Sequence, residues 1–211
     1  KNHGLPPGDL TDSQMDYVAD LAQRYSQGEI RTTYTQNLIL AHVKQRDLFS
    51  LWRELVKNRL ANPNIETLND VICCPGSDFC SLANATSIDV SEDIMRRFEN
   101  LDKLFSLGNI KINISGCMNA CGHHHVGHIG LLGVDKNGED WYQITLGGSS
   151  GNDTALGKVL GPAVAKARIG DAIERIIEVY VERRVPDETF LQTFQRIGRD
   201  PFKVKVYDNC H

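Results

Sequence analysis

The stretch CCPGSDFCSLA, residues 73–83, places three cysteines around a Pro-Gly turn, and a second stretch, SGCMNACG, follows at residues 115–122. These two stretches hold five of the six cysteines in the 211-residue chain. Six cysteines are too few for a disulfide scaffold, and the sequence shows no secretory signal region. We therefore expect metal or redox chemistry from these cysteines.

The spacing of the cysteines separates the possible kinds of metal site. Cys74 and Cys80 have five residues between them, and Cys117 and Cys121 have three. Zinc sites commonly use a two-residue knuckle that aims both sulfurs at one ion, whereas a wider loop suits sulfurs bound to separate irons. The glycines that flank the second pair let the backbone pass close to a bulky inorganic cluster. The pattern favours a [4Fe–4S] cluster held by these four thiolates.

Three other interpretations of the cysteines stay open on spacing alone. They are native disulfides, a zinc site that stabilises the domain, and a set of buried, unreactive thiols. Cys73 and Cys210 lie outside the four-cysteine pattern. We expect Cys73 to be a buried packing residue that faces away from Cys74, and Cys210 to be exposed.

The composition argues against several classes of function. The chain is 41% hydrophobic and 24% charged, with a net charge of −4, which is ordinary for a globular protein of one large or two small domains. The acidic surplus does not favour nucleic acid or anionic membranes, and no apolar run is long enough to span a bilayer. We expect a cytoplasmic protein. The opening KNHGLPPGDL lacks an initiator methionine, which indicates part of a longer chain.

Residues 1–66 carry the pattern helix, strand, strand, helix, which is typical of a small α+β unit. A capping box at Thr11 and Gln14 begins the first helix, and Gly28 ends it. β-rich runs follow at 29–34 and 36–43, and Asp47 is the expected N-cap of the second helix. The apolar residues expected to be buried are Val18, Leu21, Ala22, Tyr25, Leu48, Leu51, Trp52, Leu55 and Leu60.

The remaining residues are predicted to mix helices and strands. One helix is expected from Ser91 to Gly108, followed by a half-buried strand at 110–114 that leads into the second cysteine stretch. Strands at 129–134 and 141–146 are joined by an Asn-Gly hairpin turn. Residues 170–184 give the clearest helical pattern. Its expected buried face is Ile173, Ile176, Ile177, Tyr180 and Val181.

Taken together, the two cysteine stretches resemble the cluster signature of a known family. Cys-Pro-Gly-x-x-x-Cys-x-Leu-Ala followed by Gly-Cys-x-Asn-x-Cys-Gly is similar to the nitrite and sulfite reductase haemoproteins, which bind sirohaem and a [4Fe–4S] cluster. The resemblance extends through 129–134, 146–148 and 196–202, and back to 30–33 and 35–39. It implies an α+β fold: a ferredoxin-like half domain at 1–66, then an α/β sirohaem and [4Fe–4S] domain at 67–211.

The resemblance also implies roles for single residues. Cys74, Cys80, Cys117 and Cys121 would each bind one iron of the cluster, and Cys121 would also ligate the sirohaem iron. The candidate cofactor-binding residues are Arg31, Asn119, Gly147 and Gly148. Each has a plainer alternative: a surface ion pair for the arginine, a stabilised turn for the asparagine, and a strand-ending turn for the two glycines. His123, His124, His125 and His128 are expected to be solvated or near the cofactor, rather than an independent metal site.

The implied activity is the six-electron reduction of sulfite to sulfide or of nitrite to ammonia, with ferredoxin or a flavoprotein as the electron donor. In the family, most of the Arg and Lys side chains that bind the anion come from an N-terminal half. The implied partner is therefore the N-terminal half of the same protein, and we expect this part to be inactive alone. A cluster-bearing electron-transfer module without substrate chemistry is the alternative.

Overall fold

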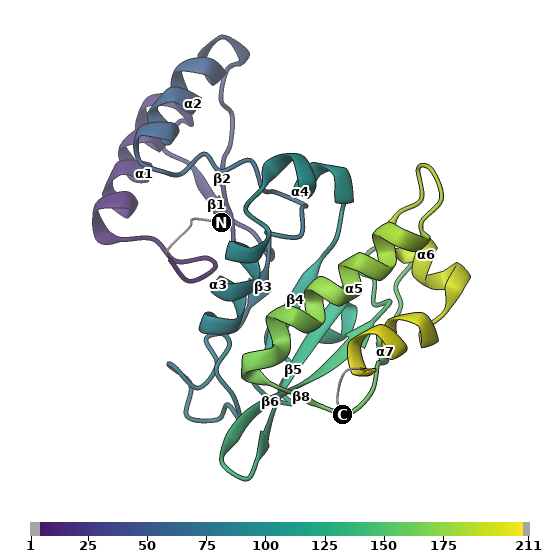
Figure 1. Cartoon of the computed structure of the whole chain (residues 1–211). Coiled ribbons are helices and arrows are strands. Elements are labelled where there is room, and N and C mark those ends of the chain that lie inside the picture. The colour runs from purple at the N-terminus through teal and green to yellow at the C-terminus, as the bar shows by residue number, and fades with distance from the viewer. Residues whose placement is uncertain (1–4, 209–211) are drawn as a thin grey trace. The chain divides into compact units, whose positions relative to one another are not determined.

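The computed structural model describes residues 5–208 and divides into two units, residues 1–65 and 66–211 (Figure 1). The first unit begins with helix α1 (Asp12–Tyr25). Its predicted capping box is confirmed: the Thr11 hydroxyl accepts from the Gln14 backbone N–H, and the Gln14 amide oxygen accepts from the Thr11 N–H. Val18, Leu21 and Ala22 are buried, as the helical spacing predicts.

Strands β1 (Ile30–Thr32) and β2 (Leu38–Leu40) form an antiparallel hairpin in which Ile30 pairs with Leu40. A short 3-10 turn, η1 (Gln45–Asp47), leads into helix α2 (Leu48–Lys57). Asp47 occupies the N-cap position as predicted, but its side chain makes no capping hydrogen bond.

The predicted buried face of α2 is largely wrong. Leu51 is buried, whereas Leu48 is 52% exposed and Trp52 is 51% exposed. Leu55 and Leu60 are half-buried and line a cavity of about 360 Å³ together with Leu51. The helical spacing is correct, but the hairpin of this unit has only two strands, and α1 meets α2 through polar contacts of Gln14 with Asn58 and of Tyr17 with Glu54. Two strands are too few to cover the apolar faces of two helices, so part of the α2 face stays exposed.

The second unit contains a six-stranded mixed sheet in the order β3-β4-β5-β6-β7, with β8 pairing β6. The strands β3, β4 and β5 are parallel, and β6 is antiparallel to β5, β7 and β8. The predicted hairpin turn is confirmed, since Asn137 and Gly138 both have positive φ, as a type I′ turn requires. The strand bounds are β3 Ile72–Cys73, β4 Ile112–Ser115, β5 Ile129–Lys136, β6 Glu139–Leu146, β7 Lys158–Val159 and β8 Val164–Ala165.

The expected single helix from Ser91 to Gly108 is two helices, α3 (Ile88–Arg97) and α4 (Leu101–Leu107). The Asn100 side chain accepts a hydrogen bond from the Lys103 backbone N–H at 2.9 Å and so caps the start of α4. A new helix therefore begins after Asn100 in place of a continuation of α3. The remaining helical elements are η2 His124–Val126, η3 Lys166–Arg168, α5 Ile169–Arg183, α6 Phe190–Ile197 and α7 Asp200–Tyr207.

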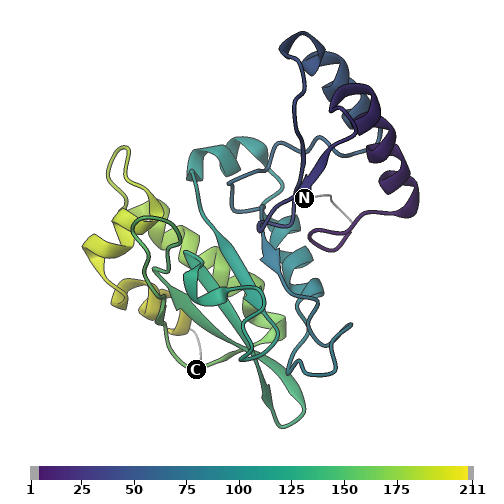
Figure 2. The ribbon, with the colours of Figure 1, turned by 180° about the vertical axis from the view of Figure 1, so that it is seen from behind.

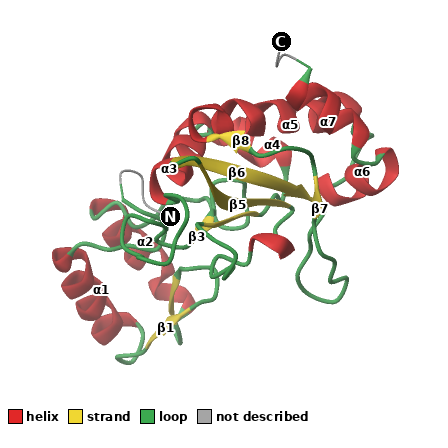
Figure 3. Cartoon of the chain, turned by 90° about the horizontal axis from the view of Figure 1, so that it is seen from below, coloured by secondary structure: helices red, strands yellow, loops and turns green. Residues whose placement is uncertain are grey.

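Helix α5 packs against α3, α6 and α7, and Figure 3 shows these helices over one face of the sheet. Seen from behind, the opposite face is crossed by loops and by η2, which contacts β4 and β5 (Figure 2). Strand β4 is therefore covered on both faces and all four of its residues are buried, so the prediction of a half-buried strand is wrong. In α5 the predicted Val181 is 46% exposed.

The core of this unit joins α5 to the central strands. Its fully buried residues include Ile112, Ile114, Ile129, Leu131, Ile144, Ile173, Ile176 and Tyr180. Within residues 5–208, no helix is both long and apolar enough to cross a membrane.

Candidate functional site

The two cysteine stretches meet because the strands before them are parallel neighbours. Cys73, the last residue of β3, pairs with Ile114 in β4, and the Cys74 backbone N–H donates to the Ile114 carbonyl at 3.1 Å. Parallel strands end at the same edge of a sheet. The turn that begins at Cys74 and the turn that begins at Gly116 therefore leave the sheet side by side.

The first cysteine loop folds back onto the second. The Gly116 carbonyl accepts from the backbone N–H groups of Asn84 and Ala85, at 2.9 and 3.1 Å. The Gly116 N–H donates to Sγ of Cys74 at 3.1 Å. The flanking glycines are needed for packing within the protein: a Cβ on Gly116 would lie 2.7 Å from the Ala85 oxygen, and one on Gly122 would lie 1.9 Å from the Ile114 oxygen. Close packing of the protein backbone therefore requires glycine at both positions. The expected closeness of these glycines to a cluster stays a prediction.

The second cysteine loop is tied to β4 by side chains inside that strand. The Ser115 hydroxyl accepts from the Gly122 N–H at 3.2 Å, and the Asn113 amide donates to the Gly122 carbonyl at 2.9 Å. Both side chains are buried. Sequence reasoning did not select them, although a buried polar pair in an otherwise apolar strand is a signal for local hydrogen bonding.

The first loop is also anchored at its far end. Thr86 donates twice to the Asp140 carboxylate, from its N–H at 3.0 Å and its hydroxyl at 2.8 Å, and the Tyr142 hydroxyl donates to the Thr86 carbonyl. Burial is the main cause that raises the pKa of Tyr142, so the phenol stays protonated and able to donate. Strand β6 thus holds the end of the loop that begins with the first cysteine pair.

The five described cysteines are free thiols, so the disulfide alternative has no support in the structure. Cys73 and Cys117 are buried, Cys74 and Cys80 are half-buried, and Cys121 is exposed. Cys73 is buried as expected, and Cys210 lies outside the described residues. Inert burial does not fit Cys121, because its thiol is open to solvent.

In the part of the chain that the structure describes, no three His, Cys, Asp or Glu side chains are grouped closely enough to hold a single metal ion. A tetrahedral zinc site needs all its sulfurs about 2.3 Å from one centre. This finding does not separate a zinc site from a cluster, because it applies to the four cysteines in either case. A cubane cluster distributes its four thiolates over four irons, and convergence of Cys74, Cys80, Cys117 and Cys121 on such a cluster stays a prediction.

The other predicted cofactor residues lie in different settings. Asn119 is exposed in the turn between Cys117 and Cys121, and its amide has no hydrogen-bond partner within residues 5–208. Arg31 lies on β1 in the first unit and pairs with Glu29, whose pKa the Arg31 hydrogen bond lowers. The surface ion pair considered for this arginine is present, and a role of either residue toward sirohaem stays a prediction.

Gly147 and Gly148 follow β6, and their surroundings explain why both are glycines. Gly147 has a φ of +83°, and a Cβ there would lie 2.2 Å from the Phe194 ring. A Cβ on Gly148 would lie 2.4 Å from the Gly127 oxygen. The Gly147 N–H already donates to the His128 carbonyl at 2.9 Å. A close backbone approach is therefore needed here for the fold itself, and a contact with a cofactor carboxylate stays a prediction.

The four clustered histidines point into different environments. His123 is exposed, His125 is half-buried, and His124 and His128 are buried. Nδ1 of His124 is buried without a hydrogen-bond partner in the described structure, and burial lowers the pKa of this histidine. His128 accepts from the Lys111 backbone N–H at 3.2 Å and stacks on Phe190. The run therefore divides between solvent and core.

The burial of His128 predicts that the free energy of unfolding depends on pH. Burial, aided by the Lys111 charge, lowers its pKa from 6.5 to about 4, while a hydrogen bond to the Asn109 backbone opposes this. Between those pH values the unfolded chain binds a proton on His128 that the folded chain does not, so stability falls as the pH drops from 6.5 to 4. We expect His128 to account for up to about 3 kcal/mol of that fall.

Urea unfolding of wild type and His128→Gln at several pH values measures this effect. The variant is expected to lose less stability between pH 6.5 and 4 than wild type does. Parallel pH profiles for the two proteins would contradict the assignment.

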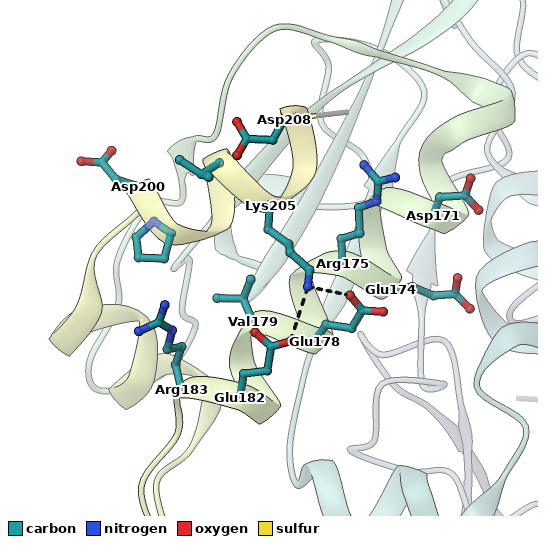
Figure 4. Close-up of a pocket in the computed structure, with 12 residues that line it drawn as sticks. Asp171, Glu174, Arg175, Glu178, Val179, Glu182, Arg183, Asp200, Lys205 and Asp208 are labelled. Carbon is teal, nitrogen blue, oxygen red and sulfur yellow. Dashed lines mark hydrogen bonds and ion pairs between the residues drawn. The ribbon is translucent and has the colours of Figure 1, made fainter. Parts of the chain in front are cut away.

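A groove of about 870 Å³ lies between α5 and α7, away from the cysteine loops (Figure 4). Lys205 crosses it to Glu178 and Glu182, at 3.2 and 3.4 Å. Its remaining charged residues are mostly acidic, and it contains no cysteine. This groove is therefore a poor candidate for binding anions or a thiolate-ligated cofactor.

Comparison with known protein families gives two matches that together span most of the chain. Residues 4–58 match the model for the nitrite/sulfite reductase ferredoxin-like half domain, and residues 65–210 match the model for the nitrite and sulphite reductase 4Fe-4S domain. The chain belongs to the nitrite and sulfite reductase family. The family and the α+β fold class expected from the sequence are both confirmed.

Relatives in this family include enzymes named for either anion. The chain is 31% identical over 178 residues to the ferredoxin–nitrite reductase of Synechococcus elongatus, covering 82% of the chain and 34% of that relative. It is 31% identical over 196 residues to sulfite reductase [ferredoxin] 2 of Mycolicibacterium paratuberculosis, covering 88% of the chain and 35% of that relative. The chain thus spans about a third of the length of these relatives.

Two solved structures share the fold of this chain. The Mycobacterium tuberculosis NirA protein superposes with a TM-score of 0.80 at 26% identity, covering 94% of this chain and 38% of that protein. A dissimilatory sulfite reductase I, DsrI, also gives a TM-score of 0.80, at 13% identity, and there the likeness shows the fold alone.

Proposed function

We propose that this chain is the cluster-bearing part of an assimilatory-type reductase of nitrite or sulfite. Cys74, Cys80, Cys117 and Cys121 are the proposed ligands of a [4Fe–4S] cluster. The observation that carries the proposal is the adjacency of the two cysteine loops at the end of β3 and β4, where the Gly116 N–H donates to the Cys74 sulfur. Family membership gives the second support.

The chemistry of the loops fits such a cluster. All four cysteines are free to act as thiolates, and an N–H donor already faces one sulfur, which stabilises negative charge there. Cys121 is exposed, so its sulfur is accessible to a second group outside the unit. We propose Cys121 as the thiolate shared with sirohaem, with the neighbouring Asn119 amide as a hydrogen-bond donor to that cofactor.

When bound, the cluster would pass on electrons from the donor and sirohaem would supply the iron for six-electron reduction of nitrite to ammonia or of sulfite to sulfide. The chain's contribution is to hold Cys121 at a fixed position, since its loop is tied through Gly122 to Ser115 and Asn113. We propose ferredoxin as the donor, because the names of the nitrite and sulfite reductase relatives include it. Free thiols suit a reducing compartment such as the cytoplasm.

We further propose that substrate binding needs the N-terminal half of the same protein and that this part is inactive alone. The support is that the chain spans about a third of its relatives. A cluster-bearing electron-transfer module without substrate chemistry is the second candidate, favoured by the same short span.

The decisive measurement is the cofactor content of the chain purified anaerobically. Bound iron and acid-labile sulfide in equal amounts, with broad absorption near 400 nm, are expected for the cluster. A colourless protein that retains zinc would contradict the proposal. Steady reduction of nitrite or sulfite by the 211-residue chain alone, with sirohaem and a chemical reductant added, would contradict its inactivity.

A further inference from the structure

Ser87 is a helix-capping residue whose hydroxyl is not used for capping. It occupies the N-cap position of α3, yet its side chain makes no hydrogen bond to the backbone N–H groups of that helix. A serine at this position normally accepts from the second or third N–H of the helix. Ser87 is also fully buried, so water does not take the place of that bond. Its hydroxyl must therefore serve another partner.

The partner is the sulfur of Cys74. The Ser87 hydroxyl oxygen lies 3.7 Å from Cys74 Sγ. The glycines of both cysteine loops leave room for this hydroxyl, since a Cβ on Gly76 would lie 2.8 Å from it and one on Gly116 would lie 3.2 Å from it. Ser87 thus fills the space between the two loops and faces the first cysteine of the site.

The direction of this hydrogen bond is fixed once Cys74 binds iron. A free thiol and a hydroxyl can each donate, but a metal-bound thiolate has no proton and can only accept. The serine must then be the donor. The Gly116 N–H, 3.1 Å from the same sulfur, is a second donor from another direction, and the positive end of the ten-residue helix α3 begins one residue after Ser87.

We propose that Ser87 donates a hydrogen bond to the cluster-bound sulfur of Cys74 and thereby raises the reduction potential of the cluster. This inference rests on the proposed function. Hydrogen bonds to the ligating sulfurs withdraw negative charge from the iron–sulfur core, and the reduced cluster, which carries one more electron, gains more from them than the oxidised cluster does. Ser87 is therefore a positioning and tuning residue that favours entry of an electron from the donor.

The test compares Ser87→Ala with Ser91→Ala in the 211-residue chain after anaerobic incorporation of iron and sulfide. Ser91 is an equally buried serine on the same helix, and its hydroxyl donates to the Ile88 carbonyl at 2.7 Å instead of to a cysteine. A redox titration followed by electron paramagnetic resonance gives the midpoint potential of each. Ser87→Ala is expected to shift the potential to more negative values, while Ser91→Ala keeps the wild-type potential.

Two further measurements separate the possible failures. Iron and sulfide content, with circular dichroism, establishes that each variant is folded and loaded; Ser87→Ala removes one oxygen and no capping bond, so it is expected to fold. Ser87→Thr restores the hydroxyl and is expected to restore the potential. A loaded Ser87→Ala chain with the wild-type potential would overturn the role of Ser87. A wild-type chain that incorporates no cluster would instead count against the proposed function.

Discussion

Replacing Cys117 by serine is expected to abolish cluster binding, with iron and acid-labile sulfide falling at least tenfold. Removing a mere outer partner of a metal ligand typically costs about 10–100-fold in affinity, and loss of the ligand itself should cost no less. Serine retains the size of the side chain but offers a hydroxyl that is a poor ligand for iron at neutral pH. The measurement is iron and sulfide per chain after anaerobic incorporation, together with absorption near 400 nm.

Cys73→Ser is the matched control. Cys73 and Cys117 are both buried; Cys73 is the last residue of β3, and Cys117 follows the end of β4 by two residues. The Cys73 thiol donates to the neighbouring Cys74 carbonyl at 3.3 Å, so it has a structural role of its own. The control is expected to keep its cluster. Wild-type cluster content in Cys117→Ser would show that Cys117 is not a ligand.

The sequence predicts those parts of the fold that depend on short-range chemistry. The Thr11–Gln14 capping box and the Asn137-Gly138 turn are local, so they appear where they are expected. Tertiary packing decides the rest. Leu48 and Trp52 have helical spacing, but burial needs a facing surface, which residues 5–65 do not provide. Asn100 carries a capping signal that the longer apolar pattern around it obscures.

In the candidate site too, local sequence features are predictable and contacts between distant residues are not. The spacing in the sequence singles out four cysteines, but it does not reveal the strand pairing that places their two loops side by side. Strand β3 is two residues long, too short for any periodic pattern to predict it as a parallel neighbour of β4. Asp140 is 54 residues from Thr86, so its hydrogen bonds to the first cysteine loop follow only from the fold.

Gly122→Ala is expected to destabilise the second unit by at least about 3 kcal/mol and to prevent cluster binding. The new Cβ would lie 1.9 Å from the Ile114 oxygen, and neither neighbour can yield easily. Strand β4 is held on both sides by β3 and β5. The cysteine loop would have to move, which breaks its hydrogen bonds to Ser115 and Asn113. Overpacking of this kind costs about 1–3 kcal/mol, and each lost hydrogen bond adds about 1 kcal/mol.

Gly138→Ala separates this clash from the general cost of removing a glycine. Gly138 lies in the exposed hairpin turn with a φ of +82°, and no atom lies within 4 Å of the position that an alanine methyl group would take. The substitution therefore costs only the backbone strain of about 1–2 kcal/mol. Urea unfolding followed by circular dichroism, with iron content measured in parallel, compares the two variants. Gly138→Ala is expected to keep its cluster. Gly122→Ala could equal Gly138→Ala in stability and iron content only if its loop moved away from Ile114 to accept the methyl group. That result would show that the site does not require the close approach of the Cys121 loop to β4.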